Sequence, residues 1–251
     1  MWSTYTFILI HTSDCLLGAF VSLRLTVDSC YNTLKEELKM KQILLATTNP
    51  GKIASFKKIL ARLGYEGLSF ADLDLDLEEP EETQLTAEDI AAEKALGYAK
   101  QYKALPVLAR DDTCDLLGVS EEDDPKNHNK AFVIARKGRY TDDLGAETFA
   151  EVASKYNGEV PCRFNWGFGL AWHEGDEIKV VHTMVSTDPK DIKLVDKISS
   201  VRVPGFCLAP VLKINIDGEW KYDSELSDGD YWKAYWDIQS EGIKSLLERL
   251  R

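Results

Sequence analysis

Three short stretches in the first half of the chain carry side chains suited to binding a phosphate group and a metal ion. The first, ATTNPGK at residues 46–52, follows an apolar run, and its Asn49 and Pro50 suit a helix cap and first helical position. A lysine in the first turn, Lys52, is disfavoured by the helix dipole by about 0.3–1 kcal/mol, and a bound anion would reverse that cost. We expect Lys52 and first-turn amides left free by Gly51 to bind an anion. The alternative is a capped helix with one solvated lysine.

The second stretch, TAEDIAAEKA at residues 86–95, combines a helix start with an acid. Thr86 and Asp89 have the spacing of a capping box, so Asp89 either completes the cap or holds a divalent metal ion. Taken alone, this stretch favours the cap.

The third stretch, VLARDDTCD at residues 107–115, places two adjacent carboxylates directly after an apolar strand, where they are costly unless solvated, paired or metal-bound. Ligands of α/β sheets bind at the carboxyl ends of strands. Asp112 could therefore coordinate Mg²⁺ and orient or deprotonate a water molecule, while Thr113 offers a hydroxyl to a phosphate. The alternative is an exposed acidic turn. Together the three stretches predict hydrolysis of a phosphate chain held by a lysine, amides and Mg²⁺.

These stretches need a framework of strands and helices to bring them together. Apolar periodicity predicts a buried strand at residues 41–47, a helix at 50–63, a second helix at 87–102 and a second buried strand at 105–110, which ends in the acidic stretch.

The later part of the chain has mostly strand patterns. Residues 162–172 alternate strictly, which predicts a strand with a crowded face of large side chains and a smooth face carrying Gly167 and Gly169. Other expected elements are strands at 130–138, 177–186 and 206–216, and helices at 146–156 and 240–251, the last capped by Ser240. The predicted fold class is α/β, with no domain boundary after Met40.

The 251-residue chain has a formal net charge of −12, and 44% of its residues are hydrophobic. This acidity argues against nucleic acid or an anionic membrane surface as a partner, because both favour basic proteins. The five cysteines are odd in number and widely spaced, which favours a reducing, cytoplasmic setting. We expect a single domain at residues 40–251. Residues 1–39 are either an upstream extension or a strand and helix packed on that domain.

The order and spacing of the three stretches resemble the inosine triphosphate pyrophosphatase, or Ham1-like, family over roughly residues 41–117. The first stretch matches that family's Thr/Ser-x-Asn-x-x-Lys opening. In the second stretch, Asp89 stands at the family's metal-binding acid and Lys94 at its lysine. In the third, Asp112 stands at the catalytic acid with Thr113 beside it.

This resemblance implies a Mg²⁺-dependent nucleoside triphosphate pyrophosphatase that releases a monophosphate and pyrophosphate. It also implies a long, mixed, twisted sheet with flanking helices, and a homodimer. Asp112 would be the catalytic acid, and Asp89 and Asp112 would bind Mg²⁺. The nucleoside triphosphate would contact Thr47, Thr48, Asn49, Lys52, Thr113 and Lys233.

The second half of the chain departs from the family pattern where the base is selected. GFCLAP at residues 205–210 has Leu208 and Ala209 in place of Tyr-Asp, and residues 237–239 replace Ser-His-Arg. Either the base pocket has been rebuilt, with the aromatic residues of 231–236 as one wall, or activity has been lost. The aromatic stretch equally suits buried packing. The alternatives are therefore a catalytically silent nucleotide-binding protein and a hydrolase of another phosphorylated small molecule.

Overall fold

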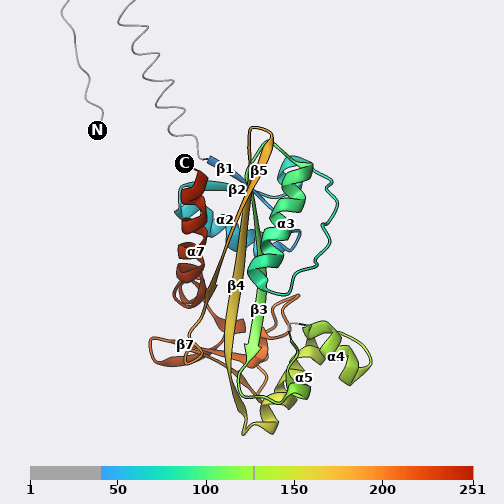
Figure 1. Cartoon of the computed structure of the whole chain (residues 1–251). Helices are drawn as coiled ribbons and strands as arrows, with labels where there is room; N and C mark the ends of the chain where they lie inside the picture. The colour runs from blue at the N-terminus through green and yellow to red at the C-terminus, as the bar shows by residue number, and fades with distance from the viewer. Residues whose placement is uncertain (1–40, 127, 251) are drawn as a thin grey trace, which may run out of the picture. The chain divides into compact units, whose positions relative to one another are not determined.

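The computed structural model describes residues 41–126 and 128–250. The strands of this region form one mixed sheet (Figure 1). Its order is β2-β1-β3-β4-β6-β7-β8, and β5 pairs with β4. β1 and β3 are parallel, whereas β4 is antiparallel to β3, β5 and β6. The strands are β1 (Lys41–Leu45), β2 (Tyr65–Leu68), β3 (Val107–Leu116), β4 (Glu159–Glu174), β5 (Glu177–Ser186), β6 (Ile192–Val195), β7 (Leu212–Ile216) and β8 (Glu219–Tyr222). The predicted α/β class is confirmed; residues 1–39 lie outside the described residues.

Helices flank this sheet on both faces (Figure 1). α3 packs on β3, β4 and β5, while α2 and α7 lie on the opposite face. The helices are α2 (Pro50–Arg62), α3 (Ala87–Gln101), α4 (Asn129–Lys137), α5 (Asp142–Lys155), α6 (Asp228–Tyr231) and α7 (Asp237–Leu247). None of them combines the length and apolar character that crossing a membrane requires.

Strand β4 has the two unlike faces that its alternating sequence predicts. Phe164, Trp166, Phe168 and Leu170 point into the larger core, under α2 and α7. On the smooth face, a Cβ atom at Gly167 would lie 2.1 Å from the carbonyl carbon of Ala87, and one at Gly169 would lie 2.3 Å from the carbonyl oxygen of Ala91. The backbone of α3 therefore rests directly on the glycines of β4, which sets the height of this helix above the sheet.

Two of the strand predictions were wrong, and the second of these errors affects the site. Residues 130–138 form helix α4, which ends at Gly138 with a φ of +75°. A short apolar run does not distinguish a strand from a buried helix segment, and here Phe132 and Val133 are its buried residues. Strand β3 does not end at residue 110 but continues to Leu116, paired throughout with β4. The acidic residues therefore lie within a strand, not after it.

The C-terminal helix also begins earlier than predicted. α7 starts at Asp237, directly after a π-helical segment at Trp232–Trp236. Ser240 is consequently inside the helix, and its hydroxyl donates a hydrogen bond to the carbonyl oxygen of Trp236 at 2.6 Å. The predicted helices at 50–63, 87–102 and 146–156 and the strand at 177–186 are confirmed to within a few residues.

The close contact between α3 and β4 predicts a large effect of one added methyl group. Gly169→Ala should lower the free energy of unfolding by about 3 kcal/mol or more, because the methyl group would overlap the helix backbone. Urea unfolding followed by circular dichroism measures this change. Gly229→Ala in α6 is the control, since a Cβ atom there would meet only Ser227 Oγ at 3.7 Å. Equal stability of the two variants would contradict the packing described.

Candidate active site

The loop between β1 and α2 caps its helix through Asn49, as predicted. The Asn49 Oδ1 atom accepts hydrogen bonds from the amides of Gly51 at 2.9 Å and Lys52 at 3.1 Å, and its carbonyl oxygen accepts one from Ile53. The Thr47 hydroxyl accepts from the Asn49 amide at 3.2 Å. The prediction of free first-turn amides was wrong, because the side-chain carbonyl of Asn49 occupies the place that an anion would take.

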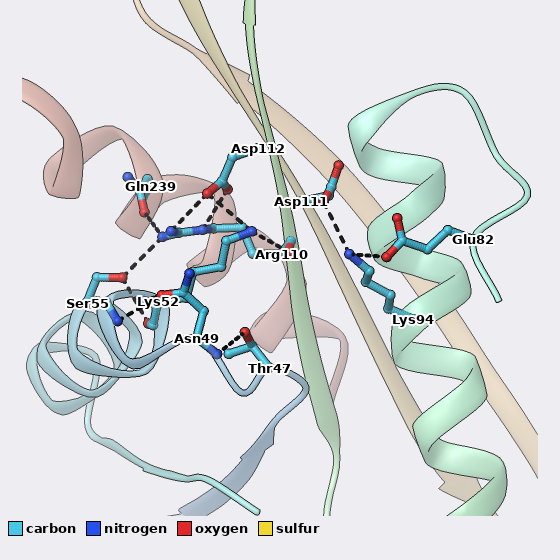
Figure 2. Close-up of polar contacts among 11 residues, drawn as sticks. Thr47, Asn49, Lys52, Ser55, Glu82, Lys94, Arg110, Asp111, Asp112 and Gln239 are labelled. Carbon is cyan, nitrogen blue, oxygen red and sulfur yellow. Dashed lines mark hydrogen bonds and ion pairs between the residues drawn. The ribbon is translucent and has the colours of Figure 1, made fainter. Parts of the chain in front are cut away.

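Lys52 has a carboxylate partner supplied by the protein itself. Its Nζ atom lies 3.3 Å from Oδ2 of Asp112 and donates to the carbonyl oxygen of Arg110 at 3.4 Å (Figure 2). The first and third stretches of the sequence therefore meet, as predicted. Asp112 offsets the unfavourable interaction between a first-turn lysine and the helix dipole.

Arg110 is the centre of this cluster and had no predicted role. Its guanidinium Nε lies 2.7 Å from Asp112 Oδ1 and its Nη2 donates to Asp112 Oδ2 at 3.1 Å. Nη1 donates to Ser55 Oγ in α2 at 3.1 Å and to Gln239 Oε1 in α7 at 3.0 Å (Figure 2). We call Lys52, Arg110 and Asp112 the α2-face cluster. Burial raises the pKa of the Asp112 carboxyl, but the charges of Arg110 and Lys52 outweigh it, so this pKa lies below its usual value.

Asp111 points to the opposite face of β3, because successive side chains of a strand alternate. Its Oδ1 atom lies 3.2 Å from Nζ of Lys94 in α3, and the same ammonium lies 2.9 Å from Oε1 of Glu82 (Figure 2). We call Glu82, Lys94 and Asp111 the α3-face cluster. Burial lowers the pKa of Lys94, but Glu82 and Asp111 outweigh it, and the pKa lies above its usual value.

Asp89 belongs to the α3 face as well, where its carboxylate bonds to the side chain of the cap residue Thr86 and does not form the predicted capping box with the Thr86 amide. The Thr86 hydroxyl donates to Asp89 Oδ2 at 2.8 Å and accepts from the Asp89 amide, while Asp89 Oδ1 lies 3.4 Å from Nδ1 of His182 in β5. Asp112 is on the other face of the sheet, so the structure does not bring the two predicted magnesium ligands together. Nowhere in the described residues do three His, Cys, Asp or Glu side chains gather as they would around a metal ion. The predicted Asp89–Asp112 magnesium site does not fit this arrangement.

The remaining predicted substrate contacts are distributed unevenly. Thr113 lies on the α3 face, where its hydroxyl accepts from Asn165 Nδ2 at 3.0 Å. Thr48 is exposed in the loop before α2. Lys233 pairs with Asp217 in the turn between β7 and β8. Their assignment as substrate contacts stays a prediction.

Sequence reasoning missed Arg110, Asp111 and Glu82 as members of the site. The signal was present in the alternation of residues 107–116: had β3 been extended through the acids, Asp111 and Asp112 would have been assigned to opposite faces. Glu82 had no such signal, because it lies in an acidic loop whose path depends on tertiary contacts.

The aromatic stretch at residues 231–236 is mainly packing. Tyr235 and Trp236 are buried, and the Tyr235 ring meets Trp166 at a centroid distance of 5.5 Å. The Tyr235 hydroxyl donates to Oδ1 of Asp223 at 2.6 Å. These contacts favour the buried-packing alternative over an open wall for a base.

Comparison with known proteins supports the resemblance at two levels. The family model described as "Ham1 family" matches residues 43–121, which contain both lysines and both β3 acids. The dITP/XTP pyrophosphatases of Mannheimia succiniciproducens and Bacillus subtilis are 47% and 43% identical to this chain over 73 and 72 residues. Each alignment covers 29% of this chain and 35% of the relative, so the match spans about a third of the relatives' length.

Solved structures extend the likeness to nearly the whole described region. The Ham1 protein of Staphylococcus aureus superimposes with a TM-score of 0.57 at 22% identity, covering 84% of this chain and 98% of that one. A HAM1 protein from Coxiella burnetii gives 0.58 at 18% identity, covering 84% and 100%. The chain is similar to the Ham1 family in sequence over residues 43–121 and shares the fold of these Ham1 structures. The Ham1 fold is therefore complete here, while sequence similarity is concentrated in the segment that carries α2, α3 and β3.

The buried guanidinium predicts a stability effect specific to Arg110. Arg110→Met should destabilise the protein by about 3 kcal/mol, because it removes the main partner of Asp112 and the links to Ser55 and Gln239. Arg62→Met is the control, since Arg62 and its partner Asp237 are both exposed and such a pair contributes at most about 1 kcal/mol. Chemical denaturation measures both values; a loss no larger than that of the control would contradict this role.

The buried carboxyl group of Asp223 makes the free energy of unfolding depend on pH. Burial raises the pKa of its carboxyl to about 6, although hydrogen bonds from Tyr235 and Tyr231 lower it. The native state therefore binds a proton more tightly than the unfolded chain, and stability falls as pH rises from about 4 through 6. Asp223→Asn should be more stable than the wild type by about 1–3 kcal/mol at pH 7.5. The difference should vanish near pH 4. Urea unfolding across this range tests it, and a difference independent of pH would contradict it.

Proposed function

We propose that this chain is a nucleoside triphosphate pyrophosphatase, which adds water to a nucleoside triphosphate and releases a monophosphate and pyrophosphate. The main observation in support is the Asp111–Lys94 ion pair on one face of β3. Its carboxylate and ammonium come from two stretches that lie within the region matched by the family model. The names of the relatives, dITP/XTP pyrophosphatases, support this reaction and suggest a purine triphosphate as substrate.

Asp111, and not the Asp112 expected from the sequence, is the acid that this geometry favours for the reaction, because both oxygens of Asp112 already face Arg110 and Lys52. Its side chain is 20% exposed and that of Lys94 is 15% exposed, so both can reach a bound ligand while retaining their mutual contact. We assign Asp111 to orienting the attacking water and accepting its proton, and Lys94 to holding the Asp111 carboxylate in place and balancing phosphate charge. The water oxygen bonds to the α-phosphorus as the bond to the bridging oxygen breaks, and pyrophosphate leaves.

Magnesium enters this proposal as part of the substrate, chelated by the triphosphate. Mg²⁺ is commonly bound by one or two carboxylates together with substrate phosphates. No step is assigned to a resident ion, because Asp89 and Asp112 occupy different faces. The roles expected for Thr47, Thr48, Asn49, Lys52 and Lys233 in binding phosphates remain predictions, as do the homodimer and the cytoplasmic location.

A second candidate is a silent family member that binds a nucleotide without hydrolysing it. Three observations favour it. Lys52 is already paired with Asp112, and the aromatic side chains at residues 235 and 236 are packed into the core. The departures at residues 208–209 and 237–239 also lie where the family selects its base.

Pyrophosphate release distinguishes these functions. Purified protein should be screened with dITP, XTP, ITP, ATP and GTP in the presence of Mg²⁺, with separate detection of pyrophosphate and phosphate. We expect release of pyrophosphate, and a loss of kcat of at least about 100-fold in Asp111→Asn. Asp176→Asn, in the exposed turn between β4 and β5, is the control and should retain full activity. Thermal stabilisation by nucleotide without turnover would replace this proposal with the silent binder.

A further inference from the structure

We propose that Glu82 is a positioning residue for Lys94, and that it fixes the Lys94 ammonium beside Asp111. We call residues 78–85, the irregular segment that brings Glu82 to α3, the α3 strap. Glu82 is assigned no contact with substrate, because it acts through Lys94. The inference rests on the proposed function for the reaction in which Lys94 takes part.

The α3 strap is attached to α3 at several points. At its start, the Gln101 side chain makes two hydrogen bonds with the backbone of Glu78, both 2.9 Å long. Pro80 then packs against Gly97, where a Cβ atom on the glycine would lie only 2.4 Å from Pro80 Cγ. Successive strap residues contact successively earlier residues of the helix, so the strap runs alongside α3 toward its N-terminus (Figure 1).

The contact that follows Glu82 fixes its backbone to the helix turn that carries Lys94. The amide and hydroxyl of Thr83 both donate to the carboxylate of Glu93, at 2.7 and 2.6 Å, and Glu93 directly precedes Lys94 in α3. Glu82 Oε1 consequently lies 2.9 Å from Lys94 Nζ, although the Glu82 side chain is 43% exposed. An exposed ion pair is usually weak because both side chains must be ordered. Here the strap already supplies part of that order.

The Lys94 ammonium lies between two carboxylates, that of Asp111 at 3.2 Å and that of Glu82 at 2.9 Å (Figure 2). A lysine ammonium has three N–H donors on a flexible four-carbon stem, so one carboxylate alone does not fix its direction. With one donor turned to each carboxylate, the third is left for a phosphate oxygen. Glu82 therefore sets an orientation that Asp111 alone would leave open.

Charge balance alone does not account for Glu82. Lys94 by itself neutralises Asp111, so two carboxylates and one ammonium leave the α3-face cluster with one excess negative charge. Such a charge repels the phosphates of a substrate, whereas a group that orients Lys94 contributes to the rate of reaction. The geometry thus favours positioning over neutralisation as the role of Glu82.

Glu82→Gln tests the positioning directly, because it keeps the shape of the side chain and removes its charge. In ¹³C relaxation measurements on the free protein, the order parameter of the Lys94 Cε–Hε bonds should fall to about 0.7 of the wild-type value or lower. Glu81→Gln is the matched control, since it removes an equal charge from the adjacent, exposed position of the strap. It should leave this order parameter unchanged. Equal values in the two variants would overturn the inference.

Turnover provides the second test. In the pyrophosphate-release assay, Glu82→Gln should lower kcat by about tenfold or more, because a slightly displaced group has a cost of this order in rate. KM should stay equal or fall, since the variant removes a negative charge near the phosphates. A kcat equal to that of Glu81→Gln, or a raised KM with unchanged kcat, would overturn the positioning role. If the wild type releases no pyrophosphate, the proposed function fails, but the relaxation measurement still decides whether Glu82 holds Lys94.

Discussion

The organisation of the site depends on the pairing of two adjacent carboxylates in β3 with cations on opposite faces of the sheet. Asp112 meets Lys52 and Arg110 on the α2 side, and Asp111 meets Lys94 on the α3 side. Carboxylates within a strand are costly unless paired, so these contacts allow β3 to continue past its apolar half. The pairs with Lys52 and Lys94 tie α2 and α3 to one strand and bring the three chemically distinctive stretches of the sequence together, while the Arg110–Gln239 hydrogen bond ties α7 to the same strand.

The elements were largely predictable, whereas the faces of the site were not. Periodicity located α2, α3 and the two-faced β4, since each has a repeat long enough to identify. The cap at Asn49 was equally local. The ion pair of Lys52 could not be predicted in this way, because its partner Asp112 is 60 residues away and reaches it only if β3 continues through the acidic residues. When β3 is ended at residue 110, Asp111 and Asp112 are read as neighbours in one loop and not as side chains on opposite faces of a strand. That reading placed Asp112 in one predicted metal site with Asp89.

The two faces differ in how firmly they hold their polar groups. On the α2 side, Arg110 is buried beneath a helix start and has a partner for each of its terminal nitrogens. On the α3 side, the glycines of β4 bring the helix backbone close to the sheet, and the Lys94 ammonium reaches Asp111 beside it. The first arrangement resembles a structural tie, and the second leaves a carboxylate and an ammonium facing each other beside the middle of a closely packed helix.

The unbroken register of β3 against β4 has an evolutionary consequence. Because Arg110, Asp111 and Asp112 are consecutive in a strand, insertion or deletion of one residue before them would exchange the helix that each side chain meets. Insertion or deletion of a single codon could thereby exchange the proposed catalytic acid with the acid that stabilises the fold. Alignments of divergent relatives that are offset by one position here would equate residues with opposite surroundings, so roles in this segment are better transferred by sheet face than by column.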